Sequence, residues 1–220
     1  MDIKDLDLNL DMSNFNMGET VDIDLGFNSA ALKRSPQIVT RRASSEKRLL
    51  ELLGDETLQP GDSWHFISGG DIDSLSFLKH VINQQQLSYC LFSTWCMAMD
   101  DVVQFEEWIK AGRIKRLDAY VGEIFPNSYS QEWKALQFIV RETSGRVCVF
   151  RNHAKIFTGH GSKYDFTIES SANINTNPRS ENTTLTIDTE LYKFYKAFYD
   201  GIKSFDRGFD NWKPWNMNGK

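Results

Sequence analysis

The segment Trp64–Thr94 reads WHFISGGDIDSLSFLKHVINQQQLSYCLFST, and its pattern of apolar residues changes twice. Trp64–Ser68 and Tyr89–Thr94 are short runs dominated by aromatic and aliphatic residues, which is typical of buried strands. Between them, apolar side chains recur every three or four positions over residues 72–86, the spacing of one face of a helix. The segment therefore predicts a strand, a crossover helix and a second strand, the unit from which parallel sheets are built.

This alternation continues toward the C-terminus. The apolar spacing predicts further helices over residues 100–111, 132–142 and about 190–205. Further strands are expected at Leu117–Val121, Val147–Phe150, Ala154–Phe157, Asp165–Ile168 and Leu185–Ile187. No helical pattern separates the last three strands, so we expect them to be antiparallel. The predicted fold class is α/β: a single domain with a mixed, mostly parallel sheet flanked by helices.

Size and composition agree with one globular domain. The chain has 220 residues, of which 40% are hydrophobic, enough for a sizeable core. No run approaches the roughly 18 apolar residues of a membrane helix, and the acidic first residues do not resemble a signal peptide. We therefore expect a cytoplasmic protein with no membrane association.

Cysteine and histidine usage bears on disulfides and metals. The three cysteines do not make a disulfide scaffold, which favours a reducing compartment. There is no C-x-x-C pair, and none of the four histidines has another four residues away. Neither a metal nor another cofactor is expected.

Charge divides the chain into parts. Residues 1–28 carry a net charge of −6 and residues 29–48 a net charge of +5. An acidic segment followed by a basic one is typical of a tail and linker outside the core. We expect residues 1–48 to be disordered or to dock on a partner, residues 49–210 to form the domain, and residues 211–220 to be a C-terminal tail. Alternating apolar residues favour a protein partner for residues 1–45 as the alternative to disorder.

One polar region departs from the pattern of core and surface. His153 and Lys155 are two residues apart on an extended segment, so their side chains face the same way. Ser171, Asn173 and Asn175 alternate in the same manner and form a second row of hydrogen-bonding groups. A histidine and a lysine beside hydroxyl and amide groups suit the binding of a phosphate and attack on it.

The order of these residues resembles a known signature. His153-Ala154-Lys155, then Ser170-Ser171-Ala172-Asn173, then Glu181-Asn182 resembles the H-x-K … G-S-x-N motif of the phospholipase D superfamily, and the resemblance spans about residues 62–205. Two positions differ. The family has an aspartate where this chain has His160, with Asp165 or Glu169 as candidate replacements, and it has a glycine where this chain has Ser170.

The resemblance implies roles for these residues. In the family, two such motifs meet at one active site, so a chain with one motif implies a homodimer with two facing copies of His153. His153 is then the nucleophile or general acid, Lys155 and Asn173 bind phosphate oxygens, Ser171 is a supporting donor, and Glu181 orients the histidine. Further substrate-binding candidates are Ser170, Asn175, Glu169 and Glu123.

The leading functional hypothesis is a metal-independent phosphodiesterase: a hydrolase acting as an endonuclease on DNA or RNA through a phosphohistidine intermediate. The alternatives are a non-catalytic phospholipase D-like module that binds nucleic acid or phosphate, and an assembly component of the virion type. A basic cluster suits a nucleic-acid backbone or a solvated face: Lys110, Arg113, Lys115 and Arg116. Trp95 is expected in the interior, with pocket lining or base stacking as the alternative.

Overall fold

The computed structural model describes residues 37–54, 56–174 and 179–217. Residues 1–36 of the predicted tail, which was expected over residues 1–48, and the predicted site residue Asn175 lie outside these ranges. The chain divides into two units, Met1–Arg41 and Arg42–Lys220, and the second holds the whole sheet.

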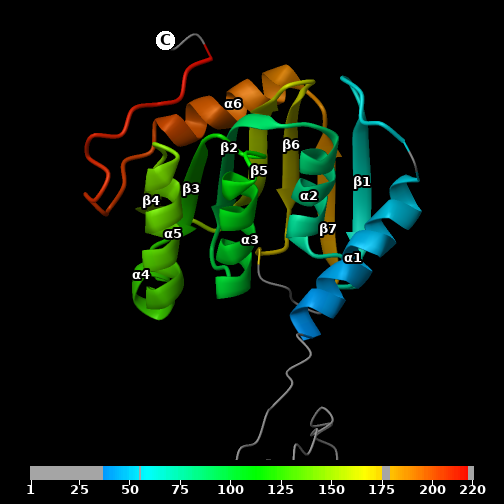
Figure 1. Ribbon diagram of the computed structural model, residues 1–220, viewed down its shortest axis with the longest axis horizontal. Helices are drawn as coiled ribbons and strands as arrows, with labels where there is room; N and C mark the ends of the chain where they lie inside the picture. The colour runs from blue at the N-terminus through cyan, green and yellow to red at the C-terminus, as the bar shows by residue number, and fades with distance from the viewer. Residues whose placement is uncertain (1–36, 55, 175–178, 218–220) are drawn as a thin grey trace, which may run out of the picture. The chain divides into compact units, whose positions relative to one another are not determined.

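The described elements follow one another as labelled in Figure 1. They are α1 (Gln37–Leu53), β1 (Ser63–Ser68), α2 (Ser74–Gln84), β2 (Leu87–Thr94), α3 (Met99–Lys110), β3 (Leu117–Gly122), α4 (Phe125–Ser128), α5 (Ser130–Glu142), β4 (Val147–Phe150), β5 (Lys155–Gly161), β6 (Asp165–Ser170), β7 (Glu181–Thr186) and α6 (Thr189–Asp200). Helix starts follow from capping residues. Asp73 accepts a hydrogen bond from the Ser76 N–H at 2.9 Å before α2, and Asp188 accepts one from the Leu191 N–H at 2.6 Å before α6.

The α/β class and the flanking helices are confirmed, but the expectation of a mostly parallel sheet is corrected. The seven strands of the described residues lie in the order β1-β7-β6-β5-β2-β3-β4. Only β2–β3 and β3–β4 pair in parallel within this sheet, and the other neighbours are antiparallel. The crossover helices α3 and α5 make the parallel half, while β5, β6 and β7 pair with one another in antiparallel order. Strand β1 pairs with β7 at the far edge instead of joining β2.

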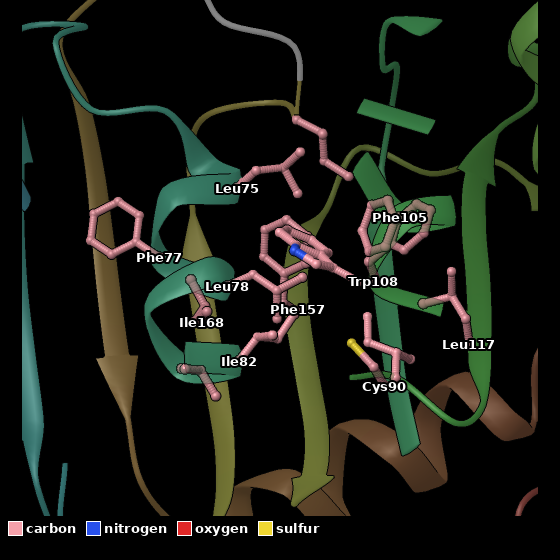
Figure 2. Packing of buried hydrophobic residues seen from close by; sticks show 14 of the residues in the cluster. Leu75, Phe77, Leu78, Ile82, Cys90, Phe105, Trp108, Leu117, Phe157 and Ile168 are labelled. Atoms are coloured by element: carbon pink, nitrogen blue, oxygen red, sulfur yellow. The ribbon is translucent and has the colours of Figure 1, made fainter. Parts of the chain in front are cut away.

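The larger core lies between one face of the sheet and the helices α2, α3 and α5, which stand side by side over the strands (Figure 1). Figure 2 shows Leu75, Leu78 and Ile82 of α2 pointing toward Phe157 and Ile168 on the sheet. These residues are the apolar stripe that the sequence places at helical spacing. Burial of this stripe against the strands is the main force that holds α2 in place.

A smaller core lies on the opposite face, beneath α6. Tyr192 and Tyr199 of α6 pack on Tyr89, Tyr120 and neighbouring strand residues. The C-terminal residues add to this layer, because Trp215 stacks on Tyr89 with ring centroids 5.0 Å apart. Helices therefore cover both faces of the sheet, and the expected C-terminal tail packs on the domain.

Helix α1 joins the domain earlier than the sequence indicates. Its Arg42 lies 2.6 Å from a carboxylate oxygen of Asp101 and 3.6 Å from one of Asp73, at the starts of α3 and α2. Leu49 is 1% exposed and belongs to the larger core. The expected boundary after residue 48 thus falls inside a helix. The sequence does not indicate this helix, because its buried apolar residues are few and basic residues dominate the stretch. Among the described helices, none is long and apolar enough to span a bilayer.

Candidate active site

The candidate site lies where β2, β3 and β4 end and the chain turns back into β5. The parallel strands deliver their carboxyl ends to one edge of the sheet, which is where open α/β sheets commonly bind ligands. His153 lies in the turn between β4 and β5 and is exposed, whereas Lys155 is the first residue of β5 and is buried at 8% exposure. The motif therefore places a solvent-accessible imidazole beside a lysine anchored in the sheet.

Asn152 fixes this turn, although it is not among the predicted site residues. Its Nδ2 lies 3.2 Å from the Thr94 carbonyl oxygen and 3.1 Å from that of Tyr120, at the ends of β2 and β3. Its Oδ1 accepts a hydrogen bond from the Ala154 N–H at 3.0 Å. One buried amide thus ties two strands to the residues on either side of His153. The only signal in the sequence is a polar residue directly before the H-x-K motif.

The imidazole and the ammonium are in direct contact. The Nζ of Lys155 lies 2.9 Å from Nδ1 and 3.3 Å from Nε2 of His153, and it donates to the His153 carbonyl oxygen at 2.7 Å. A charged lysine only donates, so the ring nitrogen that it contacts is then the acceptor. Burial lowers the pKa of Lys155, and the negative charge of Glu181 opposes that shift.

Strand register brings further predicted residues to the same face. Lys155 pairs with Ser170 across β5 and β6, and Ser170 pairs with Thr183 across β6 and β7. Glu181 is two residues before Thr183, so its side chain leaves the sheet on the same side. Lys155, Ser170 and Glu181 therefore share the face that carries α2 and α3, which explains why the charge of Glu181 acts on Lys155.

Two predicted residues are hydrogen-bonded to each other. The Ser171 hydroxyl donates to Oε2 of Glu181 and accepts from the Asn182 N–H at 3.1 Å. The Ser170 hydroxyl lies 2.9 Å from that of Thr183 and accepts from the Ala172 N–H at 3.1 Å. Ser170 thus shapes the loop, while Ser171 holds the Glu181 carboxylate. Glu181 accepts this hydrogen bond from Ser171 and acts on Lys155 through its charge. Its expected role of orienting His153 stays a prediction.

Asn173 is held next to the start of α2. The Ser74 hydroxyl lies 3.1 Å from the Asn173 carbonyl oxygen, and the following Ile174 N–H donates to the Thr94 hydroxyl at 3.3 Å. The side-chain Oδ1 of Asn173 is buried and has no hydrogen-bond partner among the described residues. A buried polar atom in this state costs about 1–3 kcal/mol, which is typical of a position that a ligand or water completes.

Two further predicted residues, Glu169 and Glu123, differ in their position relative to His153. Glu169 pairs in register with Ile156, so its side chain lies on the opposite face, where it accepts a hydrogen bond from the Tyr195 hydroxyl of α6. Glu123 is exposed just beyond β3, at the same edge of the sheet as His153. The structure therefore separates Glu169 from the His153 side of the sheet.

The candidate replacements for the family's aspartate lie away from His153. His160 is near the far end of β5, and its Nδ1 lies 2.6 Å from a carboxylate oxygen of Asp165, its partner in register on β6. Asp165 therefore places a carboxylate beside position 160, across the strand pair. His160 lies five residues along β5 from Lys155, and each residue of a strand spans roughly 3.3 Å. The His160–Asp165 pair is therefore far from His153.

An aromatic residue lies beside His153. The ring centroid of Trp95, the residue after β2, is 5.8 Å from that of His153, with 48° between the ring planes. Trp95 is half-buried, so the expectation that it packs in the interior holds only for part of its surface. The absence of a side chain at Gly122 makes room for the indole, since a Cβ there would lie 2.6 Å from its Cδ1.

Comparisons with known proteins find similarity only among solved structures. No family model matches the chain, and no curated protein matches it. The structure is similar to polyphosphate kinase from Porphyromonas gingivalis, with a TM-score of 0.47 and 13% identity, over 68% of this chain and 26% of that one. It is also similar to NucT from Helicobacter pylori, with a TM-score of 0.47 and 15% identity, over 63% of this chain and 92% of that one.

Metal-binding and charge features of the described residues complete the site. No group of three or more histidine, cysteine, aspartate or glutamate side chains in the described ranges could hold a metal ion. Of the basic cluster, Arg113 donates to the Gln85 carbonyl oxygen at 3.2 Å, and Arg116 donates to that of Lys213. These two arginines hold the domain's own backbone, and the ammonium in contact with the His153 ring is that of Lys155.

Proposed function

We propose that this protein is a metal-independent phosphodiesterase of the phospholipase D type, acting on DNA or RNA. The observation that carries the proposal is the contact of Lys155 with the exposed imidazole of His153 at the carboxyl ends of the strands. An ammonium and an imidazole side by side form a site for an anion. Asn173 adds a second polar group in the loop that carries the rest of the motif, since its Oδ1 has no partner among the described residues and its amide N–H groups can donate to a phosphate.

The residues divide the chemistry among them. A phosphate oxygen competes with the imidazole for the Lys155 ammonium, so substrate binding frees a ring nitrogen of His153 to attack phosphorus. The new P–N bond forms as the ester P–O bond breaks, and the leaving oxygen takes a proton from His153 of a second subunit. Water then attacks phosphorus, releases the first His153, and returns a proton to the second histidine. The dimer supplies the second imidazole that one chain lacks.

Hydrolysis of bis-nitrophenyl phosphate in EDTA tests the proposal, with the mass of the protein in solution measured on the same sample. We expect a dimer whose activity falls at least about a hundredfold in His153→Ala, since one acid–base group contributes that much. His65→Ala is the matched control, because His65 is exposed on β1 and bonds to Thr184. Activity that survives His153→Ala contradicts the mechanism. A folded dimer that cleaves nothing indicates a binding module instead.

A further inference from the structure

Trp95 combines three properties that a buried core residue does not need. It follows β2 directly at the edge that carries His153, and it is half-buried although Thr94 and Cys96 on either side are 0% and 4% exposed. Its ring lies 5.8 Å from the His153 ring. Part of the indole surface is therefore open to solvent beside the proposed reacting group.

The indole is held in place from behind. It lies over Gly122 at the end of β3, the strand next to β2 in the sheet (Figure 1). A Cβ at Gly122 would lie 2.6 Å from Cδ1 of the ring, closer than packed atoms allow, and 3.3 Å from Nε1. The same Cβ would lie 3.3 Å from the Asn152 carbonyl oxygen. The glycine lets the indole lie directly against the backbone, so the ring has a fixed position relative to the turn that carries His153.

We propose that Trp95 is a platform on which an unpaired base stacks while the adjoining phosphate is held at His153 and Lys155. This inference rests on the proposed function, because it takes the phosphodiester to be at His153. It adds the substrate class, which is single-stranded nucleic acid recognised without regard to sequence, since every base has a face that can stack on an indole.

The surrounding charges favour a base over the other groups that bind aromatic rings. A cationic head group stacked on Trp95 would lie next to the Lys155 ammonium, which repels it. A neutral, planar base has no such penalty. Bases of a duplex are already stacked and paired, so reaching Trp95 would require a base to be flipped out at a cost of a few kcal/mol.

Binding in EDTA separates this inference from the catalytic proposal. The probes are a labelled oligothymidylate and an abasic strand of the same length, which share their phosphates and differ in their bases. We expect the full-length protein to bind the base-containing strand about tenfold more tightly, which corresponds to about 1.4 kcal/mol. Trp95→Ala should abolish that preference and Trp95→Phe should retain most of it.

The matched control is Trp215→Ala, which removes an indole that stacks on Tyr89 on the α6 face of the sheet. It should leave the preference for bases unchanged. Equal binding of the two strands by the wild type, no binding of either, or a preference that survives Trp95→Ala overturns the inference. Hydrolysis of bis-nitrophenyl phosphate without a preference for bases leaves the proposed function standing and this inference refuted. A preference for bases without hydrolysis supports this inference and contradicts the proposed function.

Discussion

Replacing Asn152 with aspartate should loosen the turn that carries His153 while leaving its size unchanged. The Nδ2 group lies 3.2 Å from the Thr94 carbonyl oxygen and 3.1 Å from that of Tyr120, and a carboxylate would point an oxygen at both. Each buried carbonyl left without its donor costs about 1–3 kcal/mol, so the two together cost about 2–6 kcal/mol. That is a large part of the 5–15 kcal/mol that typically stabilises a domain.

The loss should depend on pH. Burial raises the pKa of an introduced carboxyl above its value of about 3.9 in an unfolded chain. The folded state then keeps a proton that the unfolded state releases, so stability falls as pH rises above that value. At low pH the protonated carboxyl can donate one of the two hydrogen bonds again. The defect of Asn152→Asp should therefore be smallest in acid and should grow toward neutral pH.

Urea unfolding at several pH values measures this effect, and phosphodiester hydrolysis by the same samples reports on His153. Asn152→Ala is the companion variant, because it removes the same donors without adding a charge and should show little pH dependence of its own. A variant Asn152→Asp that unfolds at the same urea concentration as the wild type at neutral pH would refute the reasoning. It would mean that the amide does not hold the strand ends.

Two further predictions concern the rest of the domain. Burial raises the pKa of Asp101 to about 6 from the ordinary 3.8, so its contribution to stability is present below 3.8 and is lost as pH rises through about 6. Asp101→Asn should flatten the pH dependence of unfolding in that window, and an unchanged slope would count against this assignment. Leu49→Ala in α1 should cost about 2–5 kcal/mol in chemical denaturation, since Leu49 is 1% exposed. Leu50→Ala, at a residue 52% exposed, should stay within about 0.5 kcal/mol of the wild type, and equal effects of the two would place α1 outside the core.

Most elements of the fold can be predicted from the sequence because their signals are local. The apolar spacing of α2 and the runs of β2 and β4 depend only on neighbouring residues, and the structure contains these elements within a few residues of the expected bounds. The H-x-K motif likewise places His153 and Lys155 together, since two residues along an extended chain face the same way. Helix α1 is not predicted, because its stretch contains several basic residues and only a few apolar residues that become buried.

The pairing of the strands and the completion of the site depend on contacts between distant residues. Local pattern does not reveal that β1 pairs with β7 or that β2 lies beside β5, because a strand's neighbour is chosen by the packing of the whole sheet. Register alone puts Glu169 on the α6 face and Ser170 on the face of Lys155. The roles of Asn152 and Trp95 also emerge only in three dimensions, where residues 30 to 60 positions apart in the sequence meet at the ends of β2, β3 and β4. Sequence determines which polar side chains are available to a site, and the sheet decides which of them meet, because hydrogen bonding between strands fixes their spacing and the side on which each residue emerges.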